Sequence, residues 1–208
     1  MTPGRRWSDD AGARGRLSGN LPLPDRLLAV ATRMFAEKGF ENTSVQEIVN
    51  AAGVTKGAMY HYFGSKDDLL YEIYHRLLGL QMSRLQQIAD GPGTAEERLR
   101  GAAVDVLNTS FLYLDDFTVF FRSTHLLPRD RREAVRAERR RYHERFRALV
   151  EEGQRQGTFR TDTPADIAVH FFFGTVHQIG TWYRPGGRLQ TAAISEHYVD
   201  LFLNGLRS

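Results

Sequence analysis

Apolar side chains recur at three- and four-residue steps through most of this 208-residue chain, and no stretch alternates in the way a β-strand does. The first such stripe runs from Leu27 to Phe35, and Gly39 follows where the helix should end. The same spacing predicts further helices at residues 44–52, 56–62, 66–89, 95–114, 115–127, 129–152, 164–182 and 191–206. The pattern therefore predicts an all-α protein.

The two short helices predicted within residues 43–63 carry the clearest local signals. Ser44 and Glu47 form the S-x-x-E pattern of a capping box, which starts a helix. Gly53 suits the tight turn that follows, and Thr55 is a good N-cap for the next helix. Two short helices joined by a glycine-containing turn are typical of a helix-turn-helix, whose second helix enters the major groove of DNA.

The composition of the second short helix fits contact with DNA. It begins with small or basic residues, and bulkier ones would hold its N-terminus away from base edges. The residues expected nearest the bases are Gln46, Thr55, Lys56, Gly57 and Ala58. Hydroxyl, imidazole and ammonium groups reach phosphate oxygens, and free N–H groups at a helix start attract them. The expected phosphate contacts are Thr43, Ser44, Tyr60, His61 and Lys66.

The order T-S-V-Q-E-I, A-A-G-V-T-K-G and Y-H-Y-F-G-S-K-D-D-L resembles the DNA-binding domain of TetR-type (tetracycline-repressor-like) transcriptional regulators. The resemblance is densest over residues 27–70 and, with lower density, extends over nearly the whole chain. Val49 stands where these proteins often have alanine, which changes packing only. The resemblance implies a homodimeric repressor that binds a palindromic DNA operator and leaves it when a small-molecule effector binds.

Composition divides the chain into three parts. Residues 1–22 are rich in glycine, arginine and serine, which predicts a flexible basic arm. The arm is either a solvated tail or a DNA contact in the minor groove. Residues 23–82 are expected to form the DNA-binding domain, and residues 83–208 a helical ligand-binding and dimerisation domain. In proteins similar to this one, the long helix predicted at 66–89 couples ligand binding to the spacing of two DNA-reading heads.

The overall composition narrows the classes of function. There are no cysteines, which excludes disulfides, thiol catalysis and thiolate metal sites. The net charge is +3 and the sequence pI is about 9.3, which favours an anionic partner. No apolar run approaches the roughly 20 residues of a membrane span, and the N-terminus lacks the apolar core of a signal peptide. We therefore expect a cytoplasmic protein with no membrane partner.

The predicted helix at 164–182 is apolar on more than one side, so it should be buried against two neighbours. The last helix, at 191–206, offers a second apolar face. Together they predict a homodimer that forms through a four-helix bundle, with two helices from each chain. The resemblance implies the same arrangement.

The C-terminal part has more aromatic residues than a small core needs. Each is explained by ordinary core packing, whereas the group as a whole favours a ligand cavity between helices. The expected ligand-binding residues are Phe111, Tyr113, Phe117, Phe120, Phe121, Arg122, Phe172, His177 and Trp182.

Two sequence features bear on the identity of the effector. The tract W-Y-R-P-G-G at residues 182–187 looks like one found in TetR-type repressors of lipid, steroid and fatty-acid catabolism that respond to acyl-CoA thioesters. Residues 129–147 contain nine arginines against four acids, a difference of +5. These arginines form either a solvated basic face or a site for the phosphates of CoA.

Other classes of function remain open at this stage. His170 and His177 share a helical face, but no third metal ligand lies nearby in sequence, so neither a metal nor a cofactor is expected. No catalytic arrangement stands out. One alternative is a transcriptional activator of the same fold. Another is a helical enzyme or ligand-binding protein with a vestigial helix-turn-helix, against which the small and basic residues at 55–58 argue.

Overall fold

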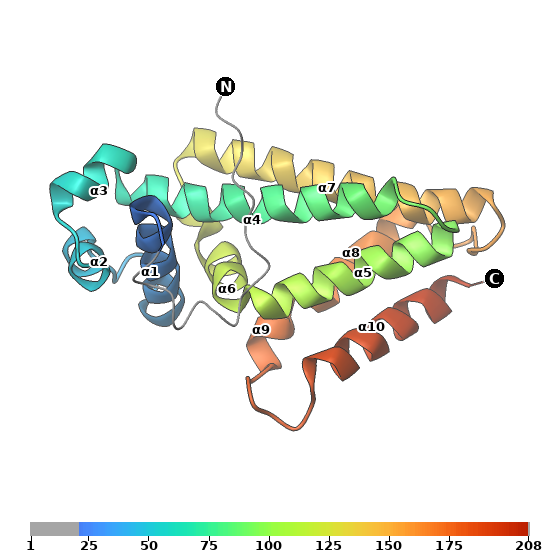
Figure 1. Cartoon of the computed structure of the whole chain (residues 1–208). Coiled ribbons are helices and arrows are strands. Elements are labelled where there is room, and N and C mark those ends of the chain that lie inside the picture. The colour runs from blue at the N-terminus through green and yellow to red at the C-terminus, as the bar shows by residue number, and fades with distance from the viewer. Residues whose placement is uncertain (1–20, 208) are drawn as a thin grey trace.

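The computed structural model describes residues 21–207, and within them the chain is helical with no strand (Figure 1). Its elements are α1 (Leu23–Lys38), α2 (Val45–Ala52), α3 (Lys56–Tyr62), α4 (Lys66–Ala89), α5 (Ala95–Leu112), α6 (Leu114–Ser123), the 3-10 turn η2 (Thr124–Leu126), α7 (Arg129–Arg155), α8 (Ala165–His177), α9 (Ile179–Trp182) and α10 (Thr191–Leu206). The all-α prediction is confirmed. The predicted arm, residues 1–22, lies almost entirely outside the described residues.

The start of each helix from α2 to α4 is set by a local hydrogen bond. Ser44 accepts from the Glu47 N–H, and the Glu47 carboxylate accepts from the Ser44 N–H at 2.8 Å, so the predicted capping box is confirmed. Thr55 caps α3 and Ser65 caps α4 in the same manner. Gly53 has a φ of 65°, the left-handed conformation that the turn between α2 and α3 requires.

Two predicted helices are interrupted in the structure. The helix predicted at 164–182 breaks at Gln178 into α8 and α9, and α9 then packs against α6. The helix predicted at 115–127 stops at Ser123 and continues as η2. Pro128 explains why η2 ends at Leu126, because the residue before a proline avoids helical backbone, and Leu127 is extended with ψ of 145°.

Helix α7 instead runs three residues past its predicted end. Gly153 does not stop it, since this glycine serves a different purpose. A Cβ atom built on Gly153 would lie 2.1 Å from the Phe159 ring, which folds back against the helix. The absence of a side chain therefore permits a close approach, and the helix ends only at Arg155.

Figure 1 shows α1, α2 and α3 gathered at one end of the molecule, from which α4 runs to the other end beside α7. Two apolar cores follow this layout. One lies among α1 to α4 and includes Tyr113 and, on α6, Val119 and Phe120. The other lies among the distal end of α4 and helices α5, α7, α8, α9 and α10. Because α6 packs against α1, the first core extends beyond residue 82, and the predicted domain division there stays a prediction.

Candidate nucleic-acid interface and ligand pocket

Helix α3 presents one face to solvent and holds the other in the core. Met59 is fully buried and anchors the helix, whereas Lys56, Gly57 and His61 are exposed. Tyr60 is 50% exposed and stands on the same outer side. The helix therefore offers small, basic and polar-tipped side chains outward from the end of the molecule.

The neighbouring predicted contacts also lie at the surface. Gln46 on α2 is exposed and its amide donates to Asn50 at 2.8 Å. The Thr55 hydroxyl accepts from the Ala58 N–H at 3.1 Å, so its own proton is free to be donated. Ser44 is exposed too, but its hydroxyl donates to the Glu47 carboxylate within the capping box.

Two of the predicted phosphate contacts have partners within the fold, and their contact with DNA stays a prediction. Thr43 is 1% exposed and its hydroxyl donates to the Gly39 carbonyl at 2.8 Å. The Lys66 ammonium donates to the carbonyls of Phe40 and Thr43 at 2.8 and 2.9 Å, and it lies over the Phe40 ring. The start of α4 adjoins the loop between α1 and α2, so Lys66 satisfies carbonyls of that loop rather than projecting into solvent.

Tyr62 was not among the expected contacts, although it is 49% exposed at the end of α3. Its ring meets that of His61 edge to face at 4.9 Å. The sequence signal for Tyr62 is its own type and position: it is an aromatic residue with a hydroxyl group, and it directly follows Tyr60 and His61.

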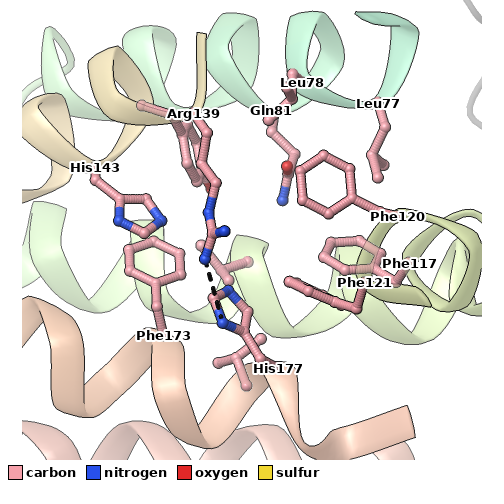
Figure 2. Close-up of a pocket in the computed structure, with 13 residues that line it drawn as sticks. Leu77, Leu78, Gln81, Phe117, Phe120, Phe121, Arg139, His143, Phe173 and His177 are labelled. Carbon is pink, nitrogen blue, oxygen red and sulfur yellow. Dashed lines mark hydrogen bonds between the residues drawn. The ribbon is translucent and has the colours of Figure 1, made fainter. Parts of the chain in front are cut away.

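An inner pocket lies between helices α4, α5, α6, α7 and α8 (Figure 2). Its space is narrow, with room for little more than a water-sized group. The lining residues are mainly aromatic and aliphatic, with Gln81, Arg139, His143 and His177 as the polar exceptions among them. In Figure 2 the rings of Phe117, Phe120 and Phe121 stand on one side, and Arg139 reaches in from the other.

An outer pocket adjoins the inner one and is larger, with about 550 Å³ of empty space against about 370 Å³, both including space open to solvent. The two pockets share Phe117, Phe121, Val176 and His177, so His177 stands at their junction. Arg122, Thr118 and Thr181 are polar members of the outer lining. The lining of the two pockets contains no Asp or Glu.

Five of the nine expected ligand-binding residues line these pockets, namely Phe117, Phe120, Phe121, Arg122 and His177. The other four lie elsewhere. Phe172 is buried between the rings of Phe146 and Phe202, and Tyr113 belongs to the first core.

The remaining two pack against residues that the aromatic count did not identify. Phe111 meets Tyr183 edge to face at 4.8 Å, and Trp182 stacks on Tyr198 of α10 at 6.3 Å. The nine expected residues are divided in this way for a physical reason: composition reports how many aromatic residues a region has, but only packing decides which of them face a cavity.

Arg139, His143 and Gln81 are pocket residues that were not expected. The sequence does not distinguish Arg139 by composition, since it is one of nine arginines in its segment. Its position along α7 does distinguish it, because the buried residues of this helix include Val135, Tyr142 and Phe146. Arg139 follows Val135 by four residues and precedes Tyr142 by three, so it occupies a place in the apolar stripe that a hydrophobic residue would ordinarily fill.

Burial shapes the charges in this pocket. It lowers the pKa of His177 to about 3, helped by the nearby charges of Arg139 and His143. The pKa of His143 is lowered to about 4 by burial and by the charges of Arg139 and His170. Both imidazoles are therefore neutral at neutral pH, and the Arg139 guanidinium is the positive charge of the inner pocket.

A set of large apolar side chains remains exposed on the far side of the second core. Ile167 and Phe171 on α8 are 58% and 61% exposed, and Leu201 on α10 is 72% exposed. Exposed apolar groups on two adjacent long helices are typical of a surface that another protein chain covers. Within residues 21–207 no helix combines the length and apolar composition that crossing a membrane requires.

A helix-turn-helix at one end of the molecule and a pocket between helices beside the middle of α4 define a DNA-binding transcriptional regulator with an effector domain. The chain belongs to the tetR family of bacterial regulatory proteins. The model of that family's N-terminal region matches residues 27–73, and the model of the tetracyclin repressor-like C-terminal domain matches residues 92–206. The resemblance noted from the sequence is thereby confirmed.

Individual relatives agree with this assignment. The HTH-type transcriptional repressor KstR2 of Rhodococcus jostii (strain RHA1) is 28% identical over 207 residues, covering 96% of this chain and 95% of the relative. The solved structure of the ketosteroid transcriptional regulator KstR2 of Mycobacterium tuberculosis has a TM-score of 0.83 at 26% identity, covering 93% of this chain and all of that one. The structure of the TetR family regulator PfmR from Thermus thermophilus has a TM-score of 0.81 at 30% identity, covering 88% of this chain and all of that one.

Proposed function

We propose that this protein is a homodimeric cytoplasmic repressor that binds a palindromic operator and releases it when a small molecule enters the pockets between α4 and α8. The observation that carries the proposal is the double role of α6. Phe120 lines the inner pocket and also belongs to the core of the DNA-reading head. A ligand that displaces α6 therefore acts directly on the head.

The contacts of α6 give this coupling a physical route. The Phe120 ring packs edge to face on Tyr74 of α4 at 5.0 Å, and the Tyr74 hydroxyl donates to the Val119 carbonyl at 3.0 Å. On its other side α6 packs against α1. A ligand weakens operator binding only if it binds one arrangement of the heads more tightly than the other. The favoured arrangement must be the one whose head spacing does not fit the operator.

Dimerisation supplies the second reading head. We assign the interface to the exposed apolar faces of α8 and α10, because Phe171 and Leu201 have no cover in the isolated chain. A two-fold dimer places two α3 helices one helical turn of DNA apart, on the two halves of a palindrome.

The effector class rests on the tract at residues 182–187, which resembles one in regulators that respond to acyl-CoA thioesters. Gly180 and Thr181 line the outer pocket immediately before this tract, and Arg184 beyond them is exposed. We therefore propose that an acyl group occupies the pockets, with the CoA moiety outside near Arg184. The role is one of binding, and we assign no catalytic activity.

The test is a genomic-fragment pull-down with the purified protein, followed by footprinting of the enriched DNA. A protected palindrome whose complex weakens steeply as salt rises supports the proposal. A panel of acyl-CoA thioesters is then added to the complex, and release by one of them supports the effector class. Absence of any enriched fragment at low salt, even after unfolding and refolding to remove a co-purified ligand, contradicts the repressor function.

A further inference from the structure

The inner pocket contains a positive charge that no residue of the pocket balances. Arg139 extends from α7 into the space between His143 and His177 (Figure 2). Its contact there is a long one of 3.5 Å to the His177 Nδ1 atom. In the described part of the chain it forms no ion pair, unlike Arg131, Arg145 and Arg147 of the same helix.

The surroundings of Arg139 make this lack of a partner costly. Burial lowers the pKa of Arg139, which means that the guanidinium is poorly solvated. The rings of Phe120 and Phe121 lie about 6 Å from it, at 6.0 and 5.8 Å, and give only a weak cation–π attraction. A desolvated arginine without a carboxylate partner ordinarily lowers the stability of the fold, unless an anion from outside pairs with it.

The shape of the two pockets indicates which part of a ligand would meet Arg139. The outer pocket is the roomier one, and Phe117 and Phe121 extend from it into the inner pocket as an aromatic wall. The inner pocket has room only for a small group. A ligand therefore fits with its bulky apolar body outside His177 and a small polar end beyond it.

A planar carboxylate matches the charge and is one of the smallest anionic groups that a ligand can carry. The guanidinium offers two parallel N–H donors to the two carboxylate oxygens. The neutral imidazole of His177 and the Gln81 amide, both in the lining, are able to donate further hydrogen bonds. Because no Asp or Glu lines either pocket, nothing there repels an anion, and Arg122 adds positive charge at the outer one.

We propose that the effector carries a carboxylate at its innermost end, bound by Arg139 with His177 and Gln81 beside it, and a hydrophobic body packed against Phe117 and Phe121. The inference rests on the proposed ligand-responsive function and narrows its effector class. A free aromatic or alicyclic acid has such a carboxylate. An acyl-CoA thioester has one only if its acyl chain ends in a second carboxyl group.

The test compares matched probes on the full-length protein by calorimetry. Phenylacetate and cyclohexanecarboxylate are paired with their primary amides, and glutaryl-CoA is paired with valeryl-CoA. We expect the acid of at least one pair to bind roughly tenfold more tightly than its uncharged partner. Preference within the first two pairs identifies a free acid, and preference within the third identifies a dicarboxylic thioester.

The Arg139→Gln variant should lose this preference, while Arg140→Gln should keep it, since Arg140 is exposed on the same helix. Operator binding in the absence of probe should persist in both variants, which shows that each is folded. Failure of every probe to bind, equal binding within every pair, or an unchanged preference in Arg139→Gln would overturn the inference. These outcomes differ from failure of the proposed function, in which no operator is bound at all.

Discussion

At the scale of single residues, we expect DNA recognition to depend on the side chains of α3 that have no partner within the fold. Lys56 is exposed, and within the described residues no hydrogen bond or ion pair holds its ammonium. Lys66, ten residues later, has its ammonium bound to two backbone carbonyls. Two lysines of one helix-turn-helix region are therefore expected to respond to substitution in opposite ways.

Replacing Lys56 with alanine should weaken operator binding roughly tenfold and leave the unfolding temperature unchanged, because a DNA contact is lost and no internal partner is disturbed. Titration of labelled operator by fluorescence anisotropy measures the effect. Arg155→Ala, at the exposed far end of α7, serves as the control and should bind normally. Normal affinity of the Lys56 variant would remove this residue from the interface.

Replacing Lys66 with methionine should instead lower the free energy of unfolding by about 1–3 kcal/mol, because the carbonyls of Phe40 and Thr43 lose a charged donor. Urea unfolding followed by circular dichroism measures it. Lys38→Met removes only the exposed ion pair with Glu47 and should cost less than about 1 kcal/mol. Unchanged stability with weaker DNA binding would contradict this structural role and support the phosphate contact predicted for Lys66.

At the scale of the elements, helix α7 has two unusual features. Gly153 leaves room for the Phe159 ring, and the side of the helix that faces the core includes the polar residues Arg139 and His143. Gly153→Ala should destabilise the protein by roughly 2 kcal/mol or more, because its methyl group would overlap the Phe159 ring. Gly79→Ala on α4 has open space and should stabilise by about 0.5–1 kcal/mol. Thermal unfolding of both variants checks the pair, and equal effects would contradict this account of Gly153.

The histidines between α7 and α8 should make stability depend on pH. Their pKa values in the folded protein, about 4 for His143 and about 3 for His177, lie below the ordinary 6.5. The unfolded chain therefore binds more protons below pH 6.5, and the free energy of unfolding should fall as pH decreases through that value. The slope is up to about 1.4 kcal/mol per pH unit for each histidine.

Unfolding measured from about pH 7.5 to about pH 5 tests this dependence. The double variant His143→Gln and His177→Gln should flatten the curve, because glutamine does not titrate. His197→Gln, at an exposed position on α10, should leave the curve as it is. A wild-type curve that is already flat in this range would show that the two imidazoles are not desolvated as described.

At the scale of the whole molecule, the proposed function requires two chains. Replacing Phe171 and Leu201 together with glutamate should dissociate the dimer, because two charges would enter an apolar interface. Light scattering should then report a monomer that keeps its helical circular dichroism but no longer protects a palindrome. The conservative change Phe171→Leu should remain dimeric. A glutamate variant that stays dimeric would place the interface elsewhere.

Much of the helical layout was predictable because its signals are local. The capping hydroxyls of Ser44, Thr55 and Ser65 bond to N–H groups three residues away, so sequence spacing alone locates these helix starts. Gly39 and Gly53 mark turns in the same way. The errors fell where distant packing overruled local preference, as at Gly153, which permits contact with Phe159 and does not end its helix.

The same distinction between local signals and distant packing applies to the candidate site. Sequence alone determined the all-α class, the helix-turn-helix and the outward residues of α3, since periodicity and motif spacing report a helix and its exposed face. Only the tertiary structure decided that Phe120 faces both a pocket and the reading head, that Phe172 belongs to the core, and that Lys66 is held by backbone carbonyls. The uncompensated charge of Arg139 belongs to this second group. These properties depend on which residues from distant helices become neighbours, and a linear pattern does not contain that information.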